Sequence, residues 1–151
     1  MPSPAHNLAV LELRDALVSQ LAGRDCHVRT ETDAEVSDFD LPQPDVTVAA
    51  GRPRDYPDRY PGPKDLWLVA EVCNTSQHRD RVQKLGLYAA AGLAPYVIVD
   101  LVSRTVEVRS EPEAEGGEYA AVEAAGPGES VTVRVGDAEV RLAVDELIPP
   151  V

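Results

Sequence analysis

Three residues in this chain have the types and the order that divalent-metal chemistry requires: Asp45, Glu71 and Lys84. Asp45 opens the apolar run 45–50, and Glu71 lies near the end of the apolar run 66–73. A charged carboxylate within an apolar strand costs free energy unless it has a partner. Carboxylate oxygens bind hard divalent cations, and a lysine can orient a water molecule or offset phosphate charge. Together the three side chains form a minimal set for metal-dependent hydrolysis of a phosphodiester.

The hydrophobic pattern predicts the elements that must position these side chains. Apolar residues repeat at helical spacing over residues 8–22, and Gly23 ends that helix. A second helix begins at Thr75 or Ser76, whose hydroxyls are good helix caps, and runs to about Ala91. Strands are predicted at residues 26–32, 45–50, 66–73, 95–102, 105–109, 118–123, 130–135 and 138–144. This order of elements indicates an α/β fold with a mixed β-sheet core flanked by helices.

Loops and chain length complete the predicted organisation. Prolines and glycines make residues 51–65 an irregular loop, and the acidic run 111–117 is predicted to be a solvated loop. A chain of 151 residues is long enough to bury a core, so residues 1–151 are expected to form a single domain.

Strand pairing would bring the two acids together. If the strands that carry Asp45 and Glu71 are neighbours, both carboxylates reach the same end of the sheet, and the backbone carbonyl of Val72 adds a third oxygen. Lys84 lies on the following helix, which packs across the sheet, so its ammonium can turn back to the carboxylates. The chain has 12 arginines and only two lysines, which suggests that this position requires a compact ammonium.

The distribution of charge along the chain is compatible with nucleic acid as a partner, although the net charge is negative. A net charge of −12 opposes broad, nonspecific binding to nucleic acid. Residues 101–151 contain 4 basic and 11 acidic residues. Residues 52–84 contain 7 basic and 5 acidic residues, so half of the 14 basic residues fall close in sequence to the candidate site.

Composition also predicts the compartment. No apolar run approaches the roughly 20 residues that span a bilayer, and the N-terminus shows no secretory signal. The two cysteines, Cys26 and Cys73, are therefore expected to be reduced thiols in a cytoplasmic protein without membrane contact. Cys73 is expected to be a small core residue rather than a nucleophile.

A set of short motifs carries a family resemblance. They are Pro44-Asp45-Val46, Val69-Ala70-Glu71-Val72, Asn74-Thr75-Ser76, Asp80, Lys84, Leu87-Tyr88, Ala91-Gly92-Leu93-Ala94-Pro95-Tyr96 and Val99-Asp100. In their order and spacing, from about residue 8 to 148, the chain resembles the PD-(D/E)XK nuclease superfamily, and within it the Uma-type restriction endonuclease family.

The resemblance implies a restriction-endonuclease-like fold and an endonuclease that hydrolyses nucleic acid, most simply DNA. Mg²⁺ or Mn²⁺ would be held by Asp45, Glu71 and the carbonyl of Val72, while Lys84 would position the attacking water. Because a nuclease that cuts both strands of a duplex is usefully two-fold symmetric, a homodimer is also expected.

The motifs depart from the family pattern at three places. Superfamily members commonly have the lysine two residues after the acid, where this chain has Cys73, and Lys84 fits the position on the next helix that the Uma-type family uses. The run Asn74-Thr75-Ser76 replaces a Ser-Pro-Ser-like run, and Val97 stands where the family usually has Trp. These changes affect packing and a helix start rather than the expected metal ligands.

Four further residues are weighed as secondary candidates. Arg79 and Arg81 are expected to contact the phosphate backbone of a substrate. Tyr88 either packs in the core or faces the substrate. His6, just before the periodic part of the first helix, is expected to be a solvated cap.

Several alternatives remain open. The chain could be a catalytically silent nuclease-fold module for binding or dimerisation, which the acidic segment 101–151 favours. Lys84 could form a purely structural ion pair with Glu71, or an exposed pair with Asp80. Asp45 could simply cap its strand. A different hydrolase lacks support, because the sequence has no Gly-x-Ser-x-Gly, His-Glu-x-x-His or glycine-rich phosphate loop.

Overall fold

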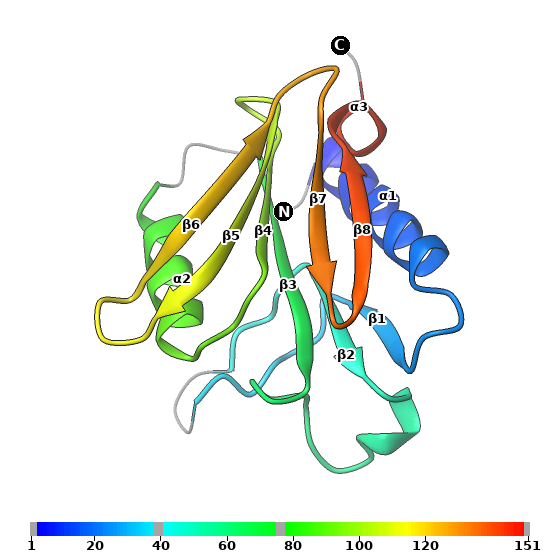
Figure 1. Cartoon of the computed structure of the whole chain (residues 1–151), viewed down its shortest axis with the longest axis vertical. Helices are drawn as coiled ribbons and strands as arrows, with labels where there is room; N and C mark the ends of the chain where they lie inside the picture. Colours follow the sequence, from blue (N-terminus) through cyan, green and yellow to red (C-terminus); the bar gives the residue numbers. More distant parts are fainter. Residues whose placement is uncertain (1–2, 38–40, 75–77, 150–151) are drawn as a thin grey trace.

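The computed structural model shows a six-stranded sheet with a helix on each face and a separate β-hairpin (Figure 1). It describes residues 3–37, 41–74 and 78–149, with only the backbone described at 78–82. The helices and strands, with one short 3₁₀ turn, are α1 (Pro4–Gln20), β1 (Cys26–Thr30), β2 (Val46–Ala50), η1 (Pro53–Asp55), β3 (Leu66–Cys73), α2 (His78–Ala90), β4 (Tyr96–Asp100), β5 (Thr105–Glu113), β6 (Glu118–Ala125), β7 (Ser130–Val135), β8 (Ala138–Ala143) and α3 (Val144–Leu147).

The main sheet is mixed, as predicted. Its strand order is β1-β2-β3-β4-β5-β6, and β7 pairs with β8 in a two-stranded sheet. Strands β3 and β4 run parallel and are joined by α2, whereas the other neighbouring pairs are antiparallel. A parallel pair needs a crossover connection, and here that crossover is the helix that carries Lys84.

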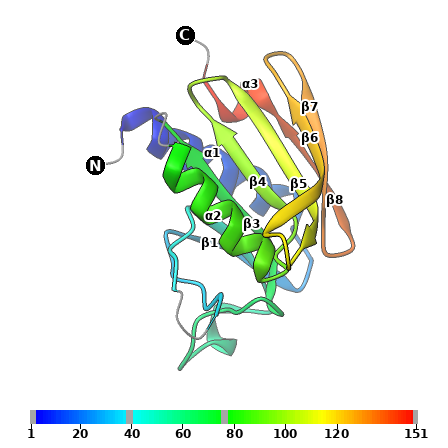
Figure 2. The same ribbon diagram turned by 90° about the vertical axis from the view of Figure 1, so that its left-hand side faces the viewer.

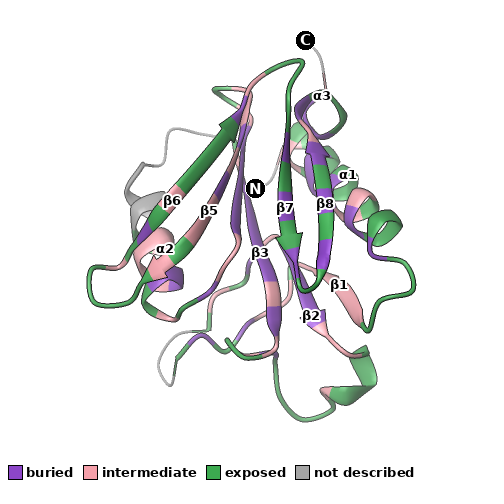
Figure 3. Ribbon diagram, viewed as in Figure 1, coloured by how far each residue is buried: buried purple, intermediate pink, exposed green. Residues whose placement is uncertain are grey.

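Burial divides the sheet into two faces. On β3, Leu68, Ala70 and Val72 pack into one core with α1, α3 and the β7–β8 hairpin. Val69, on the other face, packs into a second core with residues of α2. The two helices lie on opposite sides of the sheet (Figure 2). Strands β3 and β4 are buried along most of their length because both of their faces are covered (Figure 3).

Sequence predicted the central elements best. The apolar run 66–73 coincides with β3. Helix α1 begins four residues before the prediction, because Ser3 caps it and Pro4 occupies its first turn. The predicted caps of α2, Thr75 and Ser76, lie outside the described residues.

Two predicted strands, at residues 26–32 and 95–102, end earlier in the structure than predicted. Strand β1 ends at Thr30 rather than at residue 32, because Glu31 has a φ of 48°. Strand β4 ends at Asp100, whose Oδ1 accepts hydrogen bonds from the backbone N–H groups of Val102 (2.9 Å) and Ser103 (3.1 Å) and so forms a turn.

The acidic run 111–117 was predicted to be a solvated loop but is partly strand. Strand β5 continues to Glu113, because Pro112 pairs with Tyr119 and Glu113 with Glu118 on β6. Cross-strand pairing here outweighs a local composition that is poor for strands. The four-residue helix α3 was not predicted.

One side chain of α1 completes the outer edge of the hairpin. Gln20 Nε2 donates a hydrogen bond to the carbonyl of Arg141 (2.8 Å), and the Arg141 N–H donates one to Gln20 Oε1 (2.7 Å). The amide of Gln20 thus pairs with both peptide groups of a β8 residue, as a neighbouring strand would. Within the described part of the chain, no helix is long and apolar enough to cross a membrane.

Candidate functional site

Antiparallel pairing of β2 with β3 brings the two predicted carboxylates together. Val46 pairs with Ala70 across these strands. Continuing the same register by one residue places Asp45 opposite Glu71, on the face of the sheet that α2 covers. The condition under which the two carboxylates would reach the same end of the sheet, that their strands are neighbours, is therefore met.

Asp45 is held by two donors at one oxygen. Its Oδ2 accepts a hydrogen bond of 2.7 Å from the backbone N–H of Val72, and the Nε2 atom of His6 lies 3.4 Å from the same oxygen. The side chain keeps 17% of its surface exposed. Asp45 is therefore more than a strand cap, because it connects β2 to β3 and to α1.

Glu71 is almost fully buried, with 3% of its surface exposed, and both of its oxygens are engaged. Oε1 accepts a hydrogen bond of 2.9 Å from the hydroxyl of Tyr88, and Oε2 lies 3.3 Å from the ammonium of Lys84. Burial raises the pKa of Glu71 from its ordinary value of 4.5 to about 7. Lys84 and the Tyr88 hydrogen bond oppose this rise, whereas the charge of Asp45 adds to it.

Lys84 connects the buried acid to solvent. Its side chain is 33% exposed, whereas the side chain of Glu71, which its ammonium contacts, is 5% exposed. An ammonium at this boundary can act on a group that approaches from outside. The contact suits both the catalytic and the purely structural interpretation of Lys84, and the side chain of Asp80 lies outside the described residues.

The carbonyl of Val72 faces the side of β3 on which Asp45 lies. Cys73 O accepts a hydrogen bond from Leu101 N (2.8 Å), and Val69 N donates one to Pro95 O (3.2 Å), so odd-numbered residues of β3 bond towards β4. Even-numbered residues therefore bond towards β2, and the Val72 N–H does donate to Asp45. Since the N–H and C=O groups of one strand residue face the same neighbour, the Val72 carbonyl is directed to the same side.

Tyr88 lies in the core. It is 0% exposed, and its ring meets that of Tyr96 edge-on with centroids 5.0 Å apart. Burial and its contact with Glu71 raise its pKa. This position favours the packing alternative over contact with a substrate. The side chains of Arg79 and Arg81 lie outside the described residues.

His6 is not the solvated cap that the sequence suggested. It lies within α1, its side chain is 13% exposed, and its ring faces Asp45. Ser3 is the cap instead: its Oγ accepts a hydrogen bond from the His6 N–H (3.1 Å) and another from the side-chain amide of Asn74. The periodicity of the sequence gave no sign of this contact, because Asp45 is 39 residues away.

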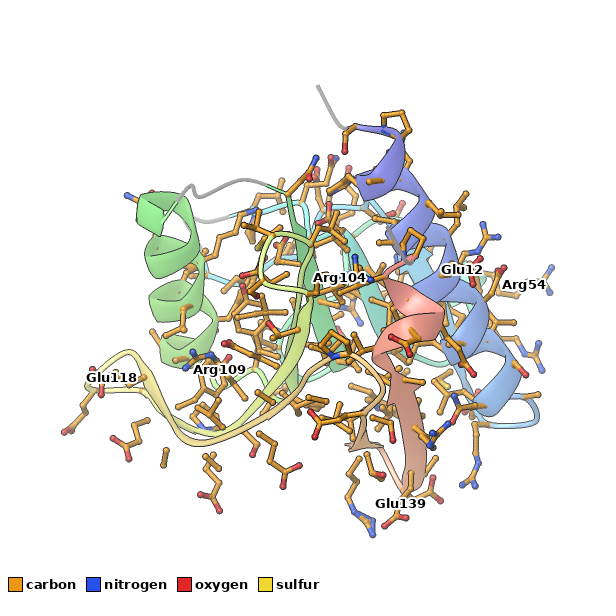
Figure 4. The ribbon with its side chains drawn as sticks, turned by 90° about the horizontal axis from the view of Figure 1, so that it is seen from above. Glu12, Arg54, Arg104, Arg109, Glu118 and Glu139 are labelled. Atoms are coloured by element: carbon orange, nitrogen blue, oxygen red, sulfur yellow. The ribbon has the colours of Figure 1, made fainter. Side chains whose placement is uncertain are left out.

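The basic residues of segment 52–84 do not all gather at the site. Arg59 forms an ion pair with Asp65 (2.7 Å) and stacks over the ring of Tyr56 (4.8 Å to the centroid). Arg54 projects on the side of the molecule away from α2 (Figure 4). Closeness in sequence therefore overstated the positive charge around the carboxylates.

Asp100 is the second buried acid among the described residues, with 9% of its surface exposed. It pairs in register with Cys73 on β3. Hydrogen bonds in the turn after β4 occupy its Oδ1 atom.

In the part of the chain that the structure describes, no three His, Cys, Asp or Glu side chains converge as a metal cluster. A cation at the site would therefore need Asp45 and Glu71 together with a backbone oxygen.

Comparison with known proteins identifies a family and a shared fold. A family model described as "Uma2: Putative restriction endonuclease" matches residues 1–145. No curated protein matches the sequence. Among solved structures, the chain is similar to one described as "a putative nuclease belonging to DUF820" from Anabaena variabilis ATCC 29413. The TM-score is 0.71 at 16% identity, over 97% of this chain and 82% of that one, which shows a shared fold.

Proposed function

The chain belongs to the Uma2 family, and on that basis we propose that it is a metal-dependent endonuclease whose site is formed by Asp45, Glu71 and Lys84. The observation that carries the proposal is the buried Glu71, which sits opposite Asp45 and 3.3 Å from the Lys84 ammonium. Three chemically suited side chains from three elements meet at one end of the sheet. Residues 1–151 would act as a single nuclease-like domain.

The donor set fits a hard divalent cation such as Mg²⁺ or Mn²⁺. Asp45 and Glu71 are close enough for the charge of one to raise the pKa of the other, so the pair has excess negative charge that a cation would offset. With the Val72 carbonyl they offer oxygen ligands alone, which these ions prefer. When bound, the ion would lower the pKa of a water molecule and polarise the scissile phosphate.

Lys84 is proposed to position the attacking water and to offset negative charge on the phosphate in the transition state. Its side chain is partly exposed to solvent, while the contact with Glu71 holds the ammonium beside the buried acid. Tyr88 holds the other oxygen of Glu71 and thereby limits rotation of that carboxylate. Each of these roles depends on α2, because the crossover helix carries both residues.

Nucleic acid is the proposed substrate, as the family implies, and DNA is the form we favour. Arg79 and Arg81 are proposed to contact its phosphates. A two-fold homodimer would cut both strands of a duplex. A cytoplasmic location is proposed for the protein.

The second candidate function is a binding or dimerisation module that has lost catalysis. One observation favours it: segment 101–151, with its 4 basic and 11 acidic residues, would repel a nucleic acid strand. In this alternative, Lys84 and Glu71 form only a structural ion pair.

A calorimetric titration with Mn²⁺ tests the proposal without knowledge of a recognition sequence. The wild type is compared with Asp45→Asn and with Asp137→Asn, an exposed aspartate whose side chain is 81% accessible. Binding in the wild type and in Asp137→Asn, but not in Asp45→Asn, is the expected result. Cleavage of plasmid DNA with Mg²⁺ or Mn²⁺ should follow the same pattern.

The titration and the cleavage assay also distinguish the two candidate functions. A wild type that binds Mn²⁺ but leaves both plasmid DNA and RNA intact would favour the silent module. Equal binding by the wild type and Asp45→Asn would remove Asp45 from the proposed site.

A further inference from the structure

The first turn of α1 closes the side of the site on which Asp45 lies. From its contacts we infer that His6 is a positioning residue: its Nε2–H donates a hydrogen bond to Oδ2 of Asp45 and so fixes the orientation in which that carboxylate meets the metal. The inference rests on the proposed function and extends the site to an element that carries none of the proposed catalytic residues.

The direction of the hydrogen bond follows from the chemistry of its partners. An ionised carboxylate can only accept, so the Nε2 atom of His6 must carry the proton. The separation of 3.4 Å is longer than a typical N–H···O bond. Catalytic hydrogen bonds are often long without ligand and shorten when the site is filled.

The contact restricts Asp45 because a second donor shares the same oxygen. The Val72 N–H reaches Oδ2 at 2.7 Å, and His6 approaches Oδ2 from α1. Neither donor takes Oδ1. Two donors on one oxygen prevent the carboxylate from rotating, and partners of this kind hold metal-binding groups in position.

A separate set of contacts fixes His6 itself. Ser3 Oγ accepts a hydrogen bond from the His6 N–H (3.1 Å) and one from the side-chain amide of Asn74. Asn74 follows Glu71 by three residues, so the first turn of α1 is connected to the end of the strand that carries the second acid. These contacts hold the backbone of His6 in place, and its side chain is only 13% exposed there.

Packing alone does not account for a histidine at this position. Its side chain is 13% exposed, and its Nδ1 atom is buried without a hydrogen-bond partner among the described residues. A buried polar atom without a partner costs free energy, and an apolar side chain would avoid that cost. The imidazole therefore serves the contact with Asp45, which only its Nε2 atom makes.

Replacement of His6 provides the test, with the affinity for Mn²⁺ measured by calorimetry at constant pH. His6→Ala removes the donor, whereas His6→Gln places an amide N–H near the former Nε2 position. His27→Ala is the matched control, because His27 is also partly buried but contacts the Gly51 carbonyl (2.8 Å) and Arg29 (3.1 Å) rather than Asp45. The melting temperature of each variant is recorded to detect loss of the fold.

We expect His6→Ala to weaken Mn²⁺ binding by about 10–100-fold while remaining folded, as replacement of outer partners of metal ligands does elsewhere. His6→Gln should recover much of the affinity, which a purely structural role would not predict, and His27→Ala should bind like the wild type. Wild-type affinity in a folded His6→Ala would overturn the inference and leave the proposed function intact. A wild type that does not bind Mn²⁺ would overturn both.

Discussion

The two ends of β3 differ in their surroundings: one end carries the polar contacts of the two acids, and the other borders a cavity. At its end, Glu71 is buried between Tyr88 and Lys84, and Val72 holds Asp45. At its beginning, Leu66 and Trp67 line a cavity of about 480 Å³ between the sheet and the β7–β8 hairpin. The end with the cavity does not hold the converging acids, and at the end with the acids Glu71 is 3% exposed.

The cavity is lined mainly by neutral side chains, and among the described residues only one acidic and one basic residue contribute to it. Glu123 on β6 and Arg134 on β7 contribute one charge of each sign, and Trp67 packs over Gly136. Clefts are the usual place to seek an active site. In this molecule the raised pKa of Glu71 indicates the site more directly than volume does, because it reflects the burial of a carboxyl group with a second acid, Asp45, beside it.

The strongest test of this contrast replaces one glutamate at the site and, in a separate variant, one glutamate at the cavity. Glu71→Gln should reduce Mn²⁺ affinity and DNA cleavage by more than about 100-fold, because it removes a proposed ligand rather than a residue that orients one. Glu123→Gln should leave both unchanged. Loss of Mn²⁺ binding in Glu123→Gln would show that the cavity belongs to the functional site.

The pH dependence of stability tests the buried acid in the absence of metal. Since burial raises the pKa of Glu71 from 4.5 to about 7, the folded chain holds a proton at intermediate pH that the unfolded chain has released. The free energy of unfolding should therefore fall as pH rises from about 4.5 to about 7, by up to about 3 kcal/mol. Urea unfolding of wild type and Glu71→Gln at each pH measures this contribution as their difference. Parallel pH profiles for the two proteins would contradict it.

Gly136→Ala should disturb the cavity end without affecting the acids. A Cβ at this position would lie 2.7 Å from Cε3 of Trp67, so we expect a loss of about 2 kcal/mol in stability and unchanged Mn²⁺ affinity. Gly128→Ala is the control, because Gly128 also has a positive φ but nothing within 4 Å of its Cβ position. Trp67 fluorescence can follow unfolding of both variants, and equal losses would mean that the contact with Trp67 is not the cause.

Tyr88→Phe should produce the smallest effect and shows how much a single hydroxyl contributes at the site. Losing the 2.9 Å hydrogen bond to Glu71 should cost about 1 kcal/mol, raise the pKa of Glu71 further and weaken Mn²⁺ binding a few-fold. Tyr119→Phe loses a 2.5 Å hydrogen bond to the Leu93 carbonyl in the same core and should leave Mn²⁺ binding unchanged. If the two variants bind Mn²⁺ equally, Tyr88 only packs.

Sequence alone predicted the parts of this molecule that depend on local pattern. A continuous apolar run marks β3, and an acid within it is unusual enough to indicate Glu71. Lys84 was predicted to turn back to the carboxylates from the following helix, and its ammonium does lie 3.3 Å from Glu71. The pairing of β2 with β3 was only a condition at that stage, and the structure meets it, as consecutive strands often do.

Features set by distant parts of the chain were not predictable in this way. His6 meets Asp45 only because α1 packs against the sheet, and nothing near His6 in sequence reports that contact. The extension of β5 to Glu113 depends on its partner β6. The irregular segment 51–65 was predicted correctly apart from the 3₁₀ turn Pro53–Asp55, but its charges could not be placed, since Arg59 is engaged by Asp65 and Tyr56.

The pairing of Gln20 with β8 has a consequence for how copies of this chain behave in concentrated solution. An uncovered strand edge offers peptide groups to which another chain can add, and this is a common route to aggregation. Because the Gln20 amide already occupies the N–H and C=O groups of Arg141, this stretch of the hairpin edge offers fewer sites for strand addition. A side chain that looks like a minor contact between helix and hairpin thus limits aggregation by strand addition at this edge.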